Sequence, residues 1–213
     1  MNINTREYWE NRFKSGDWEA KSGRQQTIFF ASKIVKILGI SNTFSGTIID
    51  FGCGLGDAMP IYRSSFRNAT LIGTDITQAA VEKCQEKYGS IAKFIQCDHQ
   101  GIPQSDIIIS SNVFEHLSNQ MEIAKQLFSK CKDLYIIVPY KERLHSGNEH
   151  VNTYDEHSFK DIGNYRFKIF TTRGWSEYGL RLLINIYLKN IVRFFLNRKI
   201  VRRKRMIMFH LYK

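Results

Sequence analysis

Short apolar runs alternate with segments of helical periodicity along most of the chain. The runs are rich in β-branched and aromatic residues and contain few polar positions, as expected for strands buried on both faces of a parallel sheet. The five predicted strands of this kind are Thr47–Phe51, Thr70–Thr74, Lys93–Gln96, Asp106–Ser110 and Leu134–Val138. Two later runs, Tyr165–Thr171 and Met206–Tyr212, could close the sheet. This alternation predicts an α/β fold in which helices cover both faces of the sheet.

Helices are predicted between the strands and before them, at Arg6–Phe13, Gln25–Leu38, Thr77–Tyr88 and Gln120–Cys131. The first two precede the first strand, so residues 1–40 are expected to form an N-terminal helical cap. No internal repeat and no linker rich in Pro, Gly or Ser divides the chain, and 213 residues suffice for one domain with a full core. We therefore expect a single domain over residues 1–213.

The C-terminal part of the chain differs from the rest in charge. After Glu177 there are ten Lys and Arg residues and no acidic residue, whereas residues 1–177 hold 21 basic and 20 acidic residues. Within Leu180–Asn197 a polar residue recurs every four positions, and apolar residues fill the opposite side of the predicted helix. Residues 178–205 are therefore expected to be a basic amphipathic insertion before the last strand.

Three uses of this insertion are compatible with the sequence. Its apolar face could pack on the domain and leave the bases in water. It could instead rest on an anionic membrane surface, where each base contributes about 1 kcal/mol. Nucleic-acid binding is disfavoured, because no aromatic stacking platform accompanies the cationic run Arg202–Arg205.

Several absences bear on location. The polar N-terminus, Met1–Glu10, lacks the apolar core of a signal peptide, and no uncharged apolar stretch of about 18 residues is present. The four cysteines lie far apart, without the paired spacing of a zinc or redox motif. The expected location is the reducing cytoplasm, with peripheral attachment to the inner membrane face if the basic insertion binds lipid.

A glycine-rich turn follows the first predicted strand. In Ile48–Asp57 (IIDFGCGLGD) three glycines stand at alternate positions. Glycine permits positive φ and lets a ligand approach the main chain closely, and the helix that follows offers amide donors. A dinucleotide fingerprint would place its third glycine at position 57, so the spacing here differs from that motif.

Polar residues end the next three strands. Asp75 follows Gly54 by 21 residues, close to the spacing of about 20 at which a carboxylate reaches ribose hydroxyls. It could instead cap the helix that starts at Thr77. Asp98 comes after the third strand and Asn112 after the fourth. Because parallel strands end at one edge of the sheet, these side chains are expected to line one crevice.

The ordered set DFGCGLGD, GTDI, CDHQ and SSNVFEHL resembles the motifs of class I S-adenosylmethionine-dependent methyltransferases. The resemblance is close over Thr47–Tyr140, and looser over YWENRF at residues 8–13 and over Met206–Tyr212. It implies a Rossmann-like three-layer sandwich with a mostly parallel seven-stranded sheet. It also implies that the last strand is antiparallel and inserted beside the fifth, and that residues 1–40 cap the cofactor.

The resemblance assigns ten residues to S-adenosylmethionine. The residues that would hold the methionine part are Asp50, Gly52, Cys53, Gly54 and Gly56. The adenosine part would meet Asp75 at the ribose, Ile76 on the adenine ring, and Asp98 with His99 at the adenine edge. Asn112 would lie beside the sulfonium.

Histidines are the candidates for a general base toward the methyl acceptor. His116 follows the fourth strand, where the methyl group would be transferred, although it could merely shape the loop. His145, His150 and His157 follow the fifth strand, where the family often places acceptor contacts, and of these we select His150. No metal site is predicted, because Glu115 and His116 would be too few ligands for Mg²⁺.

The predicted function is methyl transfer from S-adenosylmethionine, preferably to a hydroxyl of a small molecule or of a glycan or lipid-linked acceptor. Ser110–Val113 stands where amino-methylating nucleic-acid enzymes carry Asn-Pro-Pro-Tyr or Asp-Pro-Pro-Tyr, which argues against that class. The alternative from another class is a non-catalytic cofactor-binding protein or membrane-tethered scaffold. Methylation of RNA or protein ranks lower.

Overall fold

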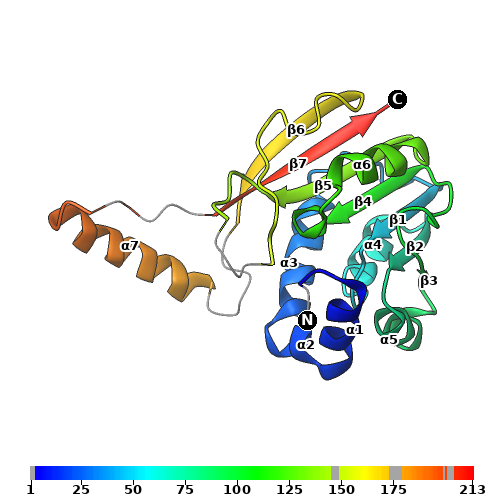
Figure 1. Ribbon diagram of the computed structural model, residues 1–213, viewed down its shortest axis with the longest axis horizontal. Coiled ribbons are helices and arrows are strands. Elements are labelled where there is room, and N and C mark those ends of the chain that lie inside the picture. The colour runs from blue at the N-terminus through cyan, green and yellow to red at the C-terminus, as the bar shows by residue number, and fades with distance from the viewer. Residues whose placement is uncertain (1–2, 145–148, 173–178, 199, 201–203) are drawn as a thin grey trace.

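The computed structural model describes residues 3–144, 149–172, 179–198, 200 and 204–213. In this part of the chain seven strands form one sheet in the order β3-β2-β1-β4-β5-β7-β6 (Figure 1). The strands are β1 Thr47–Phe51, β2 Thr70–Asp75, β3 Lys93–Gln96, β4 Ile107–Ser111, β5 Asp133–Pro139, β6 Asn164–Thr171 and β7 Arg205–Tyr212. The first five are parallel, whereas β7 is antiparallel to both β5 and β6. The predicted α/β sheet, with its antiparallel last strand beside the fifth, is confirmed.

Helices flank this sheet. They are α1 Arg6–Ser15, α2 Asp17–Ala20, α3 Gly23–Ile34, α4 Met59–Ser65, α5 Gln78–Tyr88, α6 Gln120–Ser129 and α7 Gly179–Phe195, with a 3₁₀ turn, η1, at Phe114–His116. Each helix range expected from the sequence is present, with its ends displaced by no more than four residues. The short helix α2 and the turn η1 were not expected.

Two apolar cores lie on opposite faces of the sheet. Because side chains alternate along a strand, Ile48 packs into one core and Ile49 into the other. The first core contains Ile34 of α3 and Met59 of α4, and the second contains Leu127 of α6. The central strands are therefore buried on both faces, which explains their nearly continuous apolar sequence.

Strand order reverses beside β1, which pairs with β2 on one side and with β4 on the other. In an open parallel sheet this reversal opens a crevice at the carboxyl ends of the strands, because the connections leave in opposite directions. The amides of Gly52 and Cys53, just beyond β1, both donate to the carbonyl of Thr74 at 2.8 and 2.9 Å. The glycine turn is thus attached to the end of β2.

The N-terminal helix α1 is held against the start of α5. Thr5 caps it by accepting from the amide of Tyr8 at 3.2 Å, and Gly16 ends it in the left-handed conformation. Glu10 accepts from the amide of Ala79 at 3.2 Å, and Lys83 donates to the carbonyl of Phe13 at 2.6 Å. These bonds place one side of α1 over the crevice.

Helix α7 projects away from the sheet as a separate arm between β6 and β7 (Figure 1, orange). Its described apolar side chains are exposed, among them Phe194 at 72% and Phe195 at 80%. The interpretation in which this apolar face packs on the domain is therefore wrong for these residues. The ends of the arm leave the sheet side by side, since Thr171 pairs with Arg205. None of the helices in the described residues is long and apolar enough to cross a membrane.

Candidate active site

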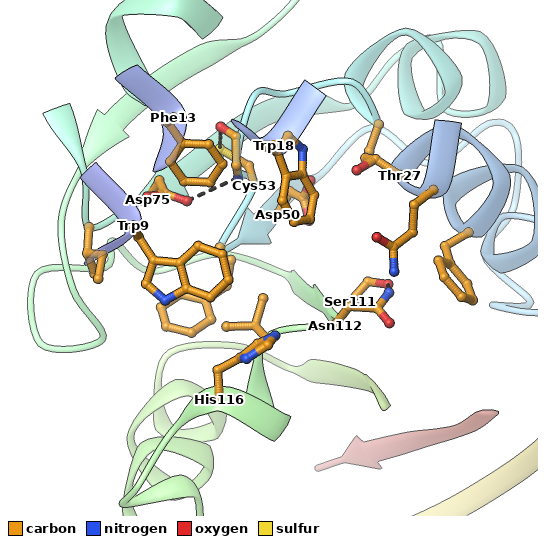
Figure 2. Close-up of a pocket in the computed structure, with 18 of the residues that line it drawn as sticks. Trp9, Phe13, Trp18, Thr27, Asp50, Cys53, Asp75, Ser111, Asn112 and His116 are labelled. Atoms are coloured by element: carbon orange, nitrogen blue, oxygen red, sulfur yellow. Dashed lines mark hydrogen bonds between the residues drawn. The ribbon is translucent and has the colours of Figure 1, made fainter. Parts of the chain in front are cut away.

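An apolar pocket occupies the crevice at the carboxyl ends of β1, β2 and β4. Its floor is formed by the strand ends and the glycine turn, and α1, α2 and α3 form a wall. Figure 2 shows the rings of Trp9, Phe13, Trp18 and His116 around the same space as Asp75. The strand ends that the sequence predicted to converge therefore do converge.

The glycine turn depends on backbone conformations that favour glycine. Gly52, Gly54 and Gly56 have φ values of +73°, +52° and +71°. A Cβ on Gly52 would lie 2.5 Å from Cγ2 of Val113, whereas a Cβ on Gly54 would meet only Phe13, at 3.5 Å. Gly54 is therefore the glycine at which the main chain is open to the pocket.

Asp75 both lines the pocket and braces the turn. Its Oδ2 accepts from the amide of Gly54 at 3.0 Å, and its Oδ1 accepts from the amide and hydroxyl of Thr77 at 3.0 and 2.7 Å. Burial raises the pKa of Asp75, against the hydrogen bonds from Thr77 and Gly54. Asp75 thus holds Thr77, the N-cap residue of α5, and does not itself cap the helix. One carboxylate has enough lone pairs for these bonds and for a ligand.

Asp50 is a second buried carboxylate in the pocket wall. Burial, followed by the negative charge of Asp75, raises its pKa to about 7. No hydrogen bond to its side chain is present among the described residues, so a positively charged ligand would favour its ionised form.

Most residues assigned to the cofactor lie in this pocket. Its lining includes Asp50, Gly52, Cys53, Gly54, Asp75, Ile76 and Asn112. Gly56 packs behind the turn, where a Cβ would lie 2.9 Å from Sγ of Cys84. Asp98 and His99 are not part of the lining. The carboxylate of Asp98 instead closes its own turn by accepting from the amides of Gln100 and Gly101, and Cys97 lines the pocket there.

The aromatic wall was not predicted from the sequence. Trp9 stacks on Phe13 with ring centres 6.1 Å apart, and both contact Trp18 edge-on. Trp9 and Phe13 are four residues apart and share one side of α1, a spacing that could have indicated a common face. Such a wall suits a flat ring or a cationic group.

Asn112 has an unusual backbone. Its φ is +57°, and its amide donates to the carbonyl of Ile137 at 2.9 Å. Asparagine tolerates this conformation better than most residues, and such strain is common at functional sites. The turn after Asn112 directs η1, and with it His116, toward the pocket.

A second, more polar cavity adjoins the first, and His116 and Asn112 line both. Its other walls include Glu115, Glu142, Glu149 and His150. The His116 and His150 rings lie 5.0 Å apart, so the two candidate bases come together from distant segments. Of the other candidates, His157 is exposed on the surface, and His145 lies outside the described residues.

Residues 49–134 match a protein family described as "Methyltransferase domain". This match covers the strand ends, the glycine turn and the 3₁₀ turn that form the pocket. The central part of the chain, with its strand ends and glycine turn, is therefore similar to a methyltransferase domain.

Solved structures agree with this fold. Plantazolicin methyltransferase BpumL, in complex with SAH, is 15% identical, with a TM-score of 0.60 over 99% of this chain and 96% of that one. Coclaurine N-methyltransferase is 12% identical, with a TM-score of 0.61 over 88% and 72%. Magnesium protoporphyrin IX methyltransferase from Synechocystis PCC 6803 is 16% identical, with a TM-score of 0.58 over 90% and 84%. No curated protein matches the sequence of this chain.

Proposed function

We propose that this protein transfers a methyl group from S-adenosylmethionine to a hydroxyl of a small molecule, or of a glycan or lipid-linked acceptor. The observation that carries the proposal is the junction of two cavities at His116, one apolar and one polar. The apolar cavity suits the cofactor, and the polar one suits an acceptor rich in hydroxyl groups. A non-catalytic binding protein would not need the second cavity.

The residues of the apolar cavity fit the cofactor. Asp75 would accept from the ribose hydroxyls, the open main chain at Gly54 would meet the methionine part, and the carboxylate of Asp50 would attract its positive charge. The helices of residues 1–40 would cap the ligand through Trp9 and Trp18. When bound, S-adenosylmethionine supplies an activated methyl group, so the chain's own task is to hold the acceptor in line and keep water away.

We further propose that His116 and His150 face the acceptor oxygen. The His116 ring is packed edge-on against Trp9 at 5.1 Å and against His150 at 5.0 Å. Burial, followed by the nearby His150, lowers the pKa of His116 to about 4, so its ring is neutral at physiological pH. The hydrogen bond to Glu142 and the charges of Glu115 and Glu142 raise the pKa of His150 despite its burial.

The proposal is tested by measuring turnover. Purified protein is incubated with S-adenosylmethionine carrying an isotopically labelled methyl group and with cell extract, and the products are identified by mass spectrometry. Label on a hydroxyl oxygen is the expected result. Cofactor binding without label transfer to any extract would favour the non-catalytic alternative, and label on nitrogen or carbon would replace the hydroxyl assignment.

Cofactor binding is expected to strengthen several-fold from about pH 5.5 to about pH 7.5, because this range ionises a group whose pKa is near 7. That group is Asp50. The titratable groups that interact with it are the carboxylate of Asp75, the thiol of Cys53 and the hydroxyl of Tyr62. The ionised form of Asp50 attracts the sulfonium and ammonium of the cofactor. Calorimetric titration at each pH measures the effect.

Two comparisons separate Asp50 from other titrating groups. An Asp50→Asn variant should bind with little dependence on pH. S-adenosylhomocysteine, which lacks the sulfonium charge, should show a smaller dependence with the unmodified protein. The assignment would be contradicted if the affinities for both ligands depended equally on pH, or if the Asp50→Asn variant kept the pH dependence of the unmodified protein.

The exposed arm favours a membrane-associated acceptor. Phe194, Phe195 and Leu196 are exposed, and the chain from Tyr178 onward carries ten bases and no acid. Apolar side chains next to a row of bases match an anionic lipid surface, to which each base contributes about 1 kcal/mol. We therefore propose peripheral attachment through residues 178–205.

Flotation with vesicles tests this attachment. The protein is expected to float with anionic vesicles and to remain with the soluble fraction when vesicles are neutral or the salt concentration is high. A double variant, Phe194→Ser with Phe195→Ser, should lose most of the binding, whereas Phe167→Ser, at an exposed position of β6, should not. Equal flotation with neutral vesicles, or none with either, would contradict membrane attachment.

A further inference from the structure

Three side chains that could bind a metal ion meet beside the junction of the two cavities. They are Glu115 and His116 of η1 and His150 of the loop after β5. Each offers a nitrogen or oxygen atom, and these atoms lie within 4.8 Å of one another. From the sequence no metal site is predicted, because Glu115 and His116 alone are too few ligands. The third lies 34 residues further along the chain.

Backbone bonds hold the two segments together. The amide of Val151 donates to the carbonyl of Glu115 at 2.8 Å, and the side-chain amide of Asn152 donates to the carbonyl of Leu117 at 2.6 Å. The loop that carries His150 is thereby attached to η1 and to Leu117, the residue after it. Three side chains placed by a braced backbone lose little freedom when they bind an ion.

Glu115 lacks the partners that a buried carboxylate needs. Glu115 is only 1% exposed, and neither of its carboxylate oxygens has a hydrogen-bond partner among the described residues. Burial raises its pKa to about 7. An isolated buried carboxylate is costly unless it is protonated, paired or bound to a metal. One of its oxygens lies within 4.8 Å of a ring nitrogen of each histidine, and a cation bound between them would satisfy it.

In both histidines one ring nitrogen lies within hydrogen-bond distance of an oxygen atom. Nδ1 of His116 lies 3.1 Å from the carbonyl oxygen of Glu149, and Nδ1 of His150 lies 2.5 Å from Oε2 of Glu142. Such acceptors favour the proton on Nδ1 and leave Nε2 free as a lone-pair donor. A carboxylate or carbonyl behind the ring is the usual support of a metal-binding histidine.

We propose that Glu115, His116 and His150 bind a divalent transition-metal ion, with Zn²⁺ as the best match. Two imidazoles and one carboxylate, with a further position left for water or substrate, form a common donor set for catalytic zinc. Mg²⁺ and Ca²⁺ prefer oxygen ligands only, so the two histidines disfavour them.

The open position would face the polar cavity, because all three ligands line it. An ion there could bind the acceptor hydroxyl and lower its pKa, with the proton released to solvent. This use of the ion rests on the function proposed above. The binding of the ion does not, because it depends only on the three side chains.

Metal binding is measured on the full chain without cofactor or acceptor. The protein is stripped with a chelator and titrated with Zn²⁺ in competition with a chromophoric chelator. One tight equivalent per chain is expected. Binding of Co²⁺ should give a visible spectrum without the thiolate absorption that ligation by the four cysteines would produce.

Variants locate the site. Glu115→Gln and His150→Ala should each weaken Zn²⁺ binding at least 100-fold, whereas His157→Ala, at an exposed histidine of the same loop, should leave it unchanged. Circular dichroism checks the fold, and Glu115→Gln keeps the size of the side chain while removing a buried charge. The proposal would be overturned if the unmodified protein did not bind Zn²⁺ tightly, or if it bound Mg²⁺ equally tightly. It would also be overturned if the Glu115→Gln and His150→Ala variants bound Zn²⁺ as tightly as the unmodified protein. Tight Zn²⁺ binding without methylation of any hydroxyl would support the site and count against the proposed function.

Discussion

An Asp75→Ala variant should bind S-adenosylmethionine about 5- to 150-fold more weakly, since a buried hydrogen bond to a charged group is worth roughly 1–3 kcal/mol. Asp75 is the carboxylate at the end of β2 that lines the pocket and also accepts from Gly54 and Thr77. The variant would remove the proposed ribose acceptor and also the bond that Asp75 accepts from the glycine turn. Calorimetry on the cofactor and on its demethylated product measures both losses.

An Asp75→Asn variant separates the two effects. Its side-chain oxygen can still accept from Thr77, while its amide cannot accept from Gly54 or from a ribose hydroxyl. Because burial raises the pKa of Asp75, removing its charge offsets part of the cost of losing the bond from Gly54. The melting temperature of the cofactor-free protein should therefore fall less in Asp75→Asn than in Asp75→Ala. The Glu86→Ala variant removes a carboxylate from the exposed side of α5 and serves as the control. Its affinity for the cofactor should be unchanged. Unchanged cofactor affinity in both Asp75 variants would remove the ribose assignment.

A Gly52→Ala variant should lose about 2–5 kcal/mol of folding stability, combining positive-φ strain with overpacking. Gly52 has φ +73°, and the added Cβ would lie 2.5 Å from Val113. Val113 has little room to move, because it is packed against the core beneath α6. Urea unfolding of the purified variant measures the loss.

Gly39→Ala provides the matched control. Gly39 also has φ +73°, but no atom lies within 4 Å of its Cβ position. Its substitution should therefore cost only the conformational strain, about 1–2 kcal/mol. Equal losses in the two variants would show that the contact with Val113 contributes nothing.

The strands and their convergence could be predicted because burial on both faces of a parallel sheet leaves a direct mark on the sequence. Thr47–Phe51, the central strand β1, has the same bounds in the structure as in the prediction. The bounds of Lys93–Gln96 also agree, although this edge strand is not buried. Asp75 could be placed because its distance from Gly54 is set by one helix and one strand. These positions follow from local periodicity and from the rule that parallel strands end at one edge.

The rest of the site depends on tertiary packing that leaves no periodic signal. Asp98 ends a strand as Asp75 does, yet its carboxylate accepts from the turn that follows it. The aromatic wall comes from α1 and α2, whose docking on α5 is not encoded in their own spacing. His150 reaches Glu115 through a loop without regular structure, so a sequence pattern could not bring these residues together.

The arm formed by α7 leaves the sheet from adjacent points on two paired strands. Beyond the Thr171 and Arg205 pair, the amide of Thr172 still donates to the carbonyl of Lys204 at 3.0 Å. The sheet therefore closes beneath the arm as a hairpin closes beneath its loop. The arm could therefore be lengthened, shortened or replaced without altering either strand, and the apolar pocket at the carboxyl ends of β1 and β2 would keep its geometry.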